Sequence, residues 1–206
     1  WSASTVTDPI SGKLCEVYEI ASYGSYVYKW ESKYDGVYWP YIDAHWRWDC
    51  RESGYISFGN DFSNLTEEEV ERISAYLSNP SSRYGGEFER MEAIYKLRNK
   101  DDAFWAWFSR VKAYWHQSEA DLARRESIPL LESQIETLAP SFKLVQTYFV
   151  LGDYYRRFDD ASKAKEYFAL ARSVQWTDDE GELQTGSEYI EKLIQERMEM
   201  MRRLAP

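Results

Sequence analysis

The sequence is poor in the residues on which most catalytic and metal sites depend. Its 206 residues include only two cysteines and two histidines, which leave few possible nucleophile–base pairs and few soft metal ligands. It has neither a glycine-rich phosphate loop nor a Gly-x-Ser-x-Gly nucleophile elbow. Acid pairs such as Asp101–Asp102 open predicted helices, where the helix dipole favours negative charge. We therefore expect neither catalysis nor a cofactor.

Long apolar runs and basic patches are missing as well. The mean hydropathy is -0.65, and no apolar run approaches the roughly 20 residues that a membrane-spanning helix needs. The formal net charge is -10, which repels a nucleic-acid backbone unless a basic patch intervenes. The basic pairs are separated and flanked by acids: Arg124–Arg125, Arg156–Arg157 and Arg202–Arg203. We expect no transmembrane segment and no nucleic-acid partner, and we leave the oligomeric state open.

Aromatic residues are abundant, at 17% of the chain, and they divide it into two parts. In residues 1–62, stretches such as "CEVYEIASYGSYVYKW" alternate apolar and polar side chains, as strands with one buried face do. From residue 63 the apolar spacing becomes helical. We predict an α+β, mainly α fold, with a small antiparallel β domain over 1–62 and a helical domain over 63–206. Helices are predicted at roughly 66–78, 87–98, 102–116, 118–138, 142–157, 160–174 and 183–204.

Residues 145–178 match one tetratricopeptide repeat, whose pattern is W-x2-L-G-x2-Y followed by A-x3-F, with Tyr in place of the first Trp. Gly152 and Ala164 are small where the two helices would cross. The side chains that would fill the space around this crossing are Tyr148, Leu151, Tyr155, Phe168 and Ala171. Because one repeat cannot bury its own face, we expect a tetratricopeptide-like array of helical hairpins.

The last predicted helix, 183–204, carries an apolar stripe. Its members are Ile190, Leu193, Ile194 and Met198, with Met201 following. Two interpretations are open. We favour packing of this helix against the preceding helices as the cap of the array. The alternative is a methionine-containing stripe that binds a partner.

Two short stretches near the N-terminus, "TDPISGKLC" and "DCRESGYISF", share the outline of a zinc knuckle. With the following "GNDF", the intervening "YKWESKYDGVYWPY" and the repeat, the chain resembles a bacterial family of unknown function. That family joins an N-terminal zinc ribbon to a tetratricopeptide-like helical tail. The ribbon is degenerate here, because the knuckle positions hold Asp8, Ser11, Cys50 and Ser53, and serine is a poor zinc ligand. We expect no bound metal.

In a ribbon the two knuckles lie side by side, so Cys15 could approach Cys50. A disulfide between them is one replacement for the metal, and aromatic packing is another. Two buried free thiols are the remaining possibility. The compartment stays unknown, although the cysteine pair and the absence of Met at the first position favour an extracytoplasmic one, periplasmic or secreted.

Repeat helices, a lost metal site and missing catalytic motifs together indicate a non-catalytic protein. Our first hypothesis is a scaffold, an adaptor or an accessory subunit that binds another protein or a multisubunit assembly. The contact residues that we expect to be exposed near the repeat groove are Tyr154, Arg156, Arg157 and Lys163. On this hypothesis, reversing the charge of Arg156 and Arg157 weakens binding of an acidic partner and leaves stability nearly unchanged.

The alternative hypothesis is a carbohydrate- or small-ligand-binding module in the aromatic N-terminal domain. Trp39, Trp46 and Trp48 could stack on the apolar faces of sugars. The same rings could instead form the core of a ribbon without metal. Burial discriminates between the two interpretations, because a stacking platform needs exposed rings.

Overall fold

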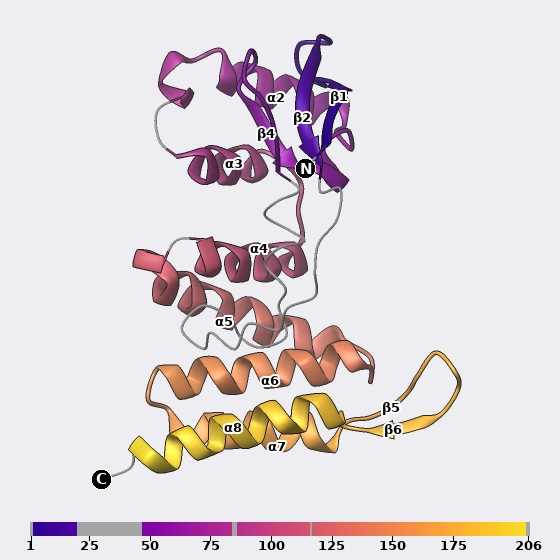
Figure 1. Cartoon of the computed structure of the whole chain (residues 1–206), viewed down its shortest axis with the longest axis vertical. Helices are drawn as coiled ribbons and strands as arrows, with labels where there is room; N and C mark the ends of the chain where they lie inside the picture. The colour runs from indigo at the N-terminus through magenta and orange to yellow at the C-terminus, as the bar shows by residue number, and fades with distance from the viewer. Residues whose placement is uncertain (1, 20–46, 84–85, 116, 205–206) are drawn as a thin grey trace. The chain divides into compact units, whose positions relative to one another are not determined.

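The structure is a computed structural model, which describes residues 2–19, 47–83, 86–115 and 117–204 (Figure 1). Residues 20–46 lie outside the described residues. They include Trp39 and Trp46, two of the three tryptophans proposed to stack on a ligand. The strands are β1 (Ser2–Thr7), β2 (Leu14–Glu19), β3 (Arg47–Cys50), β4 (Tyr55–Phe58), β5 (Gln175–Thr177) and β6 (Leu183–Thr185). The helices are α2 (Glu67–Leu77), α3 (Glu87–Lys96), α4 (Asp102–Trp115), α5 (Ala120–Thr137), α6 (Phe142–Arg157), α7 (Ala161–Ser173) and α8 (Glu188–Leu204).

The strands pair as three antiparallel two-stranded sheets, β1–β2, β3–β4 and β5–β6. Seven α-helices hold most of the residues that form regular elements in the described part of the chain. The predicted α+β, mainly α fold is thus confirmed. None of the described helices combines the length and the apolar character needed to cross a membrane.

The chain forms two compact units, and the first continues to Asp101. The expected boundary at residue 62 falls inside this unit, because α3 packs on β4. The buried Tyr95 hydroxyl of α3 accepts a hydrogen bond from the Phe58 amide at 3.1 Å, and the two rings lie 5.7 Å apart. The second unit begins at Asp102 and contains α4 to α8.

Residues at the positions that we compared with zinc knuckles close the turns of the two N-terminal hairpins. Between β1 and β2, the Asp8 carboxylate accepts hydrogen bonds from the Ile10 amide at 2.9 Å and the Ser11 hydroxyl at 2.5 Å. Between β3 and β4, Ser53 Oγ accepts from the Tyr55 amide at 3.0 Å. Turn hydrogen bonds therefore occupy these side chains. The described residues hold no cluster of three His, Cys, Asp or Glu that could bind a metal ion.

A disulfide joins these hairpins. Cys15 of β2 and Cys50 of β3 are bonded, with their Cα atoms 5.5 Å apart, and Cys50 is completely buried. Aromatic packing supports the same region, since Phe62 lies against Trp48 and Tyr55 at centroid distances of 5.4 and 5.0 Å. Closing a loop with a sequence separation of 35 stabilises the fold by about 4 kcal/mol on the chain-entropy model. The predicted Cys15–Cys50 disulfide and aromatic packing around Trp48 thus occur in the same region.

In the second unit, α4 packs with α5 and α6 with α7 as helical hairpins, and α8 lies along α6 and α7 (Figure 1). The predicted helix over 183–204 begins later, at Glu188, because residues 175–185 form the β5–β6 hairpin. The Asp178 carboxylate closes this hairpin by accepting the amides of Glu180 and Glu182 at 3.1 and 2.8 Å. Gly181 supplies the positive φ, 85°, that the turn requires.

The core of the second unit contains the predicted crossing of α6 and α7. Ala164 and Phe168 are completely buried there. A Cβ atom added to Gly152 would lie 2.5 Å from two ring carbons of Phe168, so only glycine fits. The expected filling residues Leu151 and Ala171 are also buried, whereas Tyr148 and Tyr155 are partly buried at the edge of this core.

The apolar stripe of α8 belongs to the same core. Ile190 and Ile194 are each 1% exposed and Leu193 is 9% exposed. Met198 and Met201 pack against the cluster from its edge. Packing within the unit, rather than a free methionine stripe, is therefore the role of this face.

Substitution of Gly152 tests the helix crossing. We expect Gly152→Ala to lower the free energy of unfolding by up to about 2 kcal/mol. The clash with Phe168 costs about 1–3 kcal/mol, which is offset in part by a gain of about 1 kcal/mol in helix propensity. Urea unfolding followed by far-UV circular dichroism measures the difference. In a Phe168→Leu background the added methyl group should be neutral or stabilising. An equal penalty in both backgrounds would contradict the contact as its cause.

Candidate functional site

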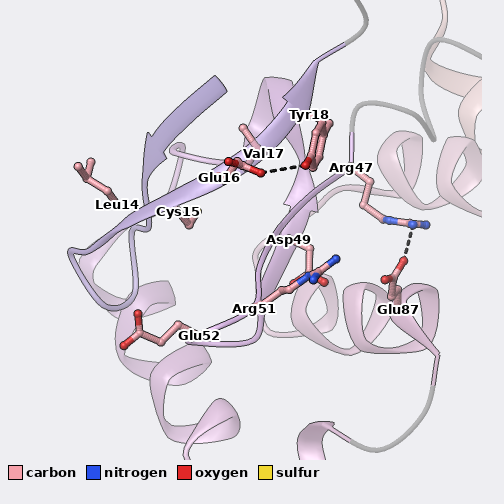
Figure 2. A pocket seen from close by; sticks show the side chains of 10 residues that line it. All are labelled: Leu14, Cys15, Glu16, Val17, Tyr18, Arg47, Asp49, Arg51, Glu52 and Glu87. Atoms are coloured by element: carbon pink, nitrogen blue, oxygen red, sulfur yellow. Dashed lines mark hydrogen bonds and ion pairs between the residues drawn. The ribbon is translucent and has the colours of Figure 1, made fainter. Parts of the chain in front are cut away.

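A pocket of about 500 Å³ opens in the first unit beside the disulfide (Figure 2). Leu14, Glu16 and Tyr18 form one wall, because alternate side chains of β2 point to the same face. Leu14 is 73% exposed and Tyr18 53% exposed. The other lining residues are Cys15, Val17, Arg47, Asp49, Arg51, Glu52 and Glu87.

Most charges around this pocket are already compensated. Arg47 forms an ion pair with Glu87, which Figure 2 shows across its edge. Glu52 pairs with Lys13. Arg51 also lines the pocket, and its guanidinium forms no ion pair with a described residue. Its side chain is exposed.

Hydrogen bonding and burial shift the pKa of two further pocket groups. Tyr18 donates a hydrogen bond to Glu16 at 2.8 Å, and this bond raises the pKa of the Tyr18 hydroxyl. Burial raises the pKa of the Asp49 carboxyl and outweighs the opposing effect of Arg90, whose Nη2 lies 2.9 Å from Oδ2. The buried Oδ1 atom of Asp49 has no hydrogen-bond partner among the described residues.

Trp48 is the one proposed stacking residue that falls among the described residues. Its indole packs edge-on against Phe62 and sits so close to Gly59 that an added Cβ would come within 2.8 Å of the ring. This packing favours the interpretation of Trp48 as a core residue. The pocket residues were missed by sequence reasoning. The alternation of Leu14, Glu16 and Tyr18 predicts a shared face, but only the disulfide places that face beside β3.

A buried carboxylate organises the second unit. Asp153 of α6 is completely buried. Its oxygens accept hydrogen bonds from the Nε atoms of Arg156, Arg157 and Arg197 at 2.9, 3.1 and 3.0 Å. Burial by itself would raise the pKa of Asp153, but the three guanidinium groups outweigh it and hold the pKa below its ordinary value. Because Arg197 belongs to α8, the network fastens α8 to α6.

This network corrects two expectations about partner binding. The side chains of Arg156 and Arg157 are only 9% and 13% exposed, so a reversal of their charge disrupts the fold. Tyr154 is 1% exposed and lies in the core, because it faces inward from α6 rather than toward solvent. Of the four proposed contact residues, only Lys163 is exposed.

A second pocket, of about 470 Å³, lies at the start of α5. Arg124 and Arg157 line it. Both guanidinium groups serve ion pairs within the unit, Arg124 with Asp121 at 2.7 Å and Arg157 with Asp153 at 3.1 Å. These cations are therefore committed to the fold.

Lys163 belongs to a cluster that we call the tyrosine face: Glu132, Tyr148, Tyr155, Lys163 and Tyr167. The cluster spans α5, α6 and α7. Lys163 is exposed, and the other four residues are partly exposed. Tyr155 and Tyr167 stack at a centroid distance of 5.6 Å and an angle of 5°. Tyr148 lies 6.2 Å from Tyr167. Three rings from two helices thus form one aromatic surface.

Hydrogen bonds hold this surface in place. Glu132 Oε1 accepts the hydroxyls of Tyr155 and Tyr167 at 2.6 and 3.0 Å. The Lys163 ammonium donates to Tyr155 Oη at 2.9 Å and lies 4.4 Å from that ring's centroid. Burial and the bond to Glu132 raise the pKa of Tyr155, and the bond to Tyr155 raises the pKa of Lys163. At neutral pH the phenol is therefore uncharged and the ammonium charged.

Comparisons with known proteins identify no relative of this chain. No protein-family model matches it, and neither a curated protein nor a solved structure matches it. Functional conclusions therefore rest on the chain's own residues.

Substitution of Asp153 tests the buried network. We expect Asp153→Asn to lower the free energy of unfolding at pH 7 by about 3–5 kcal/mol, because buried guanidinium groups lose their counter-ion. The folded-state pKa of Asp153 is depressed, so its contribution is complete above the ordinary aspartate pKa of about 4 and is lost as the pH falls below it. Urea unfolding at pH 7 and in acid should show a smaller acid-induced loss in the variant.

The exposed Asp179 offers a matched control. We expect Asp179→Asn to change stability by less than about 0.5 kcal/mol and to retain the acid dependence of the wild type. A stability of Asp153→Asn equal to that of the wild type would contradict the structural role of the network.

Proposed function

We propose that the protein is a non-catalytic interaction protein, a scaffold, adaptor or accessory subunit, that binds another protein through the tyrosine face. The observation that carries this proposal is the set of hydrogen bonds and ring contacts that fix the side chains of the face. Glu132 fixes the hydroxyls of Tyr155 and Tyr167, and the side chains of all three remain partly exposed. A preorganised surface loses less side-chain entropy on binding.

The residue types of the face support the same proposal. Tyrosine is enriched among the residues that dominate binding energy, because it offers a large rigid ring and a polar tip. The face crosses three consecutive helices, α5 to α7, as the binding grooves of helical repeats do. The tetratricopeptide-like pattern of α6 and α7, and the resemblance to a family with such a tail, are consistent with this use of the helices.

Native mass spectrometry of the full chain, isolated gently from its source without reductant, tests the proposal. We expect a mass above the 24.4 kDa of the chain. Tyr148→Ala should remove most of the bound partner, because it truncates a partly exposed ring of the face. Tyr148 packs at the edge of the core and its ring lies 6.2 Å from that of Tyr167, so urea unfolding of the variant must show that the fold is retained.

Tyr18→Ala is the control, because it removes a tyrosine of the first unit that is 53% exposed and thus more accessible than the partly buried Tyr148. It should retain the partner. A wild-type spectrum that shows only the monomer would overturn the proposal. Loss of the partner in both variants would show that the tyrosine face is not the specific binding surface.

The pocket of the first unit favours small-ligand binding as a second candidate function. Its volume of about 500 Å³ falls within the usual range for ligand sites. Tyr18 offers an exposed ring, and Arg51 offers a cation. A fluorescence titration with a panel of mono- and oligosaccharides should then give a response that Tyr18→Ala abolishes and Tyr148→Ala retains. No response to the panel in the wild type would exclude sugar binding.

A further inference from the structure

We propose that the tyrosine face is a cation site that receives a lysine or arginine side chain of the partner protein, and that Lys163 occupies this site in the free protein. The inference rests on the function proposed above and adds the chemistry of the partner. It follows from three features of the face: the ring surfaces, the shared carboxylate and the position of the Lys163 ammonium.

The ring surfaces and the carboxylate both attract positive charge. The face of an aromatic ring carries negative potential, so a cation within about 6 Å of its centroid is stabilised. Tyr155 and Tyr167 donate their hydroxyl protons to Glu132, which leaves the lone pairs of both phenol oxygens to accept from another donor. An acidic side chain at this place would meet a carboxylate and negative ring faces. The site therefore selects an ammonium or a guanidinium group.

Lys163 already makes the interaction that the partner would make. Its ammonium lies 4.4 Å from the Tyr155 centroid and donates to Tyr155 Oη. Its backbone is fixed, because the Lys163 amide donates to the Asp160 carboxylate at 3.0 Å at the start of α7. The four-carbon side chain is exposed. It can therefore swing away and leave the site without any change in the helices.

The charge of the whole chain supports the same partner chemistry. A net charge of -10 attracts a basic protein and repels an acidic one over distances comparable to the screening length. At the face itself, an incoming lysine or arginine exchanges with Lys163, so the number of cations at Glu132 stays the same. Lys163 thus competes with an incoming cation for the same rings and carboxylate, and this competition weakens the binding of an isolated lysine or arginine side chain.

Nuclear magnetic resonance of the full chain with labelled tyrosine rings tests the inference. The probes are the peptides acetyl-Gly-Lys-Gly-amide and acetyl-Gly-Arg-Gly-amide, with acetyl-Gly-Glu-Gly-amide as the acidic control. We expect both basic peptides to shift the ring resonances of Tyr155 and Tyr167. Lys163→Ala should strengthen their binding about two- to fivefold, the worth of an exposed cation–π contact.

Each variant has a matched control on the same helix. Lys165→Ala removes another exposed lysine of α7 and should leave peptide binding unchanged. Glu132→Gln keeps a hydrogen-bond acceptor but removes the charge, and it should weaken binding by up to about fivefold. Glu136→Gln on the exposed part of α5 should have no effect. Equal affinities of Lys163→Ala and Lys165→Ala, or equal shifts with the acidic peptide, would overturn the inference.

The outcomes separate this inference from the proposed function. A partner that depends on Tyr148, together with basic peptides that do not bind, would leave the interaction function standing and reject the cation site. Basic peptides that bind in the expected order, together with a bare monomer in the native mass spectrum, would retain the cation site and reject the interaction function.

Discussion

The second unit depends on the compensation of one buried carboxylate. A charge without solvent is tolerated only where other charges and hydrogen bonds replace the lost hydration. Two of the arginines that compensate Asp153 lie one turn away on α6, and the third, Arg197, lies on α8. The position of α8 along α6 is therefore set by electrostatics as well as by its apolar stripe. Apolar contacts alone would tolerate small shifts that this geometry does not.

The same helix, α6, connects the core to the surface that we assign to binding. Its inward side meets α7 at Gly152, where the absence of a side chain lets Phe168 approach closely. One turn further, Tyr155 leaves the core and stacks on Tyr167 of α7. Because the crossing sets the separation of α6 and α7, it also sets the separation of the two rings. The core and the tyrosine face are consequently parts of one packing arrangement.

The helical part of the fold was predictable because its signals are local. The spacing of Leu151, Gly152 and Phe168 specifies two packed helices within one short segment. The β5–β6 hairpin was not predicted. Its turn depends on hydrogen bonds from nearby backbone amides to one carboxylate, that of Asp178. The Asp153 network was not predicted either, because the i, i+3 and i+4 spacing of its charges on α6 also fits an exposed helix face. The contact with Arg197 of α8, which is far away in the sequence, is what reveals that this face of α6 is covered by another helix. The pocket beside β2 likewise requires a contact between segments that are far apart in the chain.

The disulfide also changes how the chain is connected. With Cys15 bonded to Cys50, residues 16–49 form a side loop, and a shorter covalent path runs directly from β2 to β3. A force that pulls on the N-terminus passes through the two sulfur atoms without extending the loop. A single cut in any peptide bond of the loop leaves both fragments attached to each other. The β1–β2 hairpin is therefore tethered to the first unit independently of the continuity of the intervening chain.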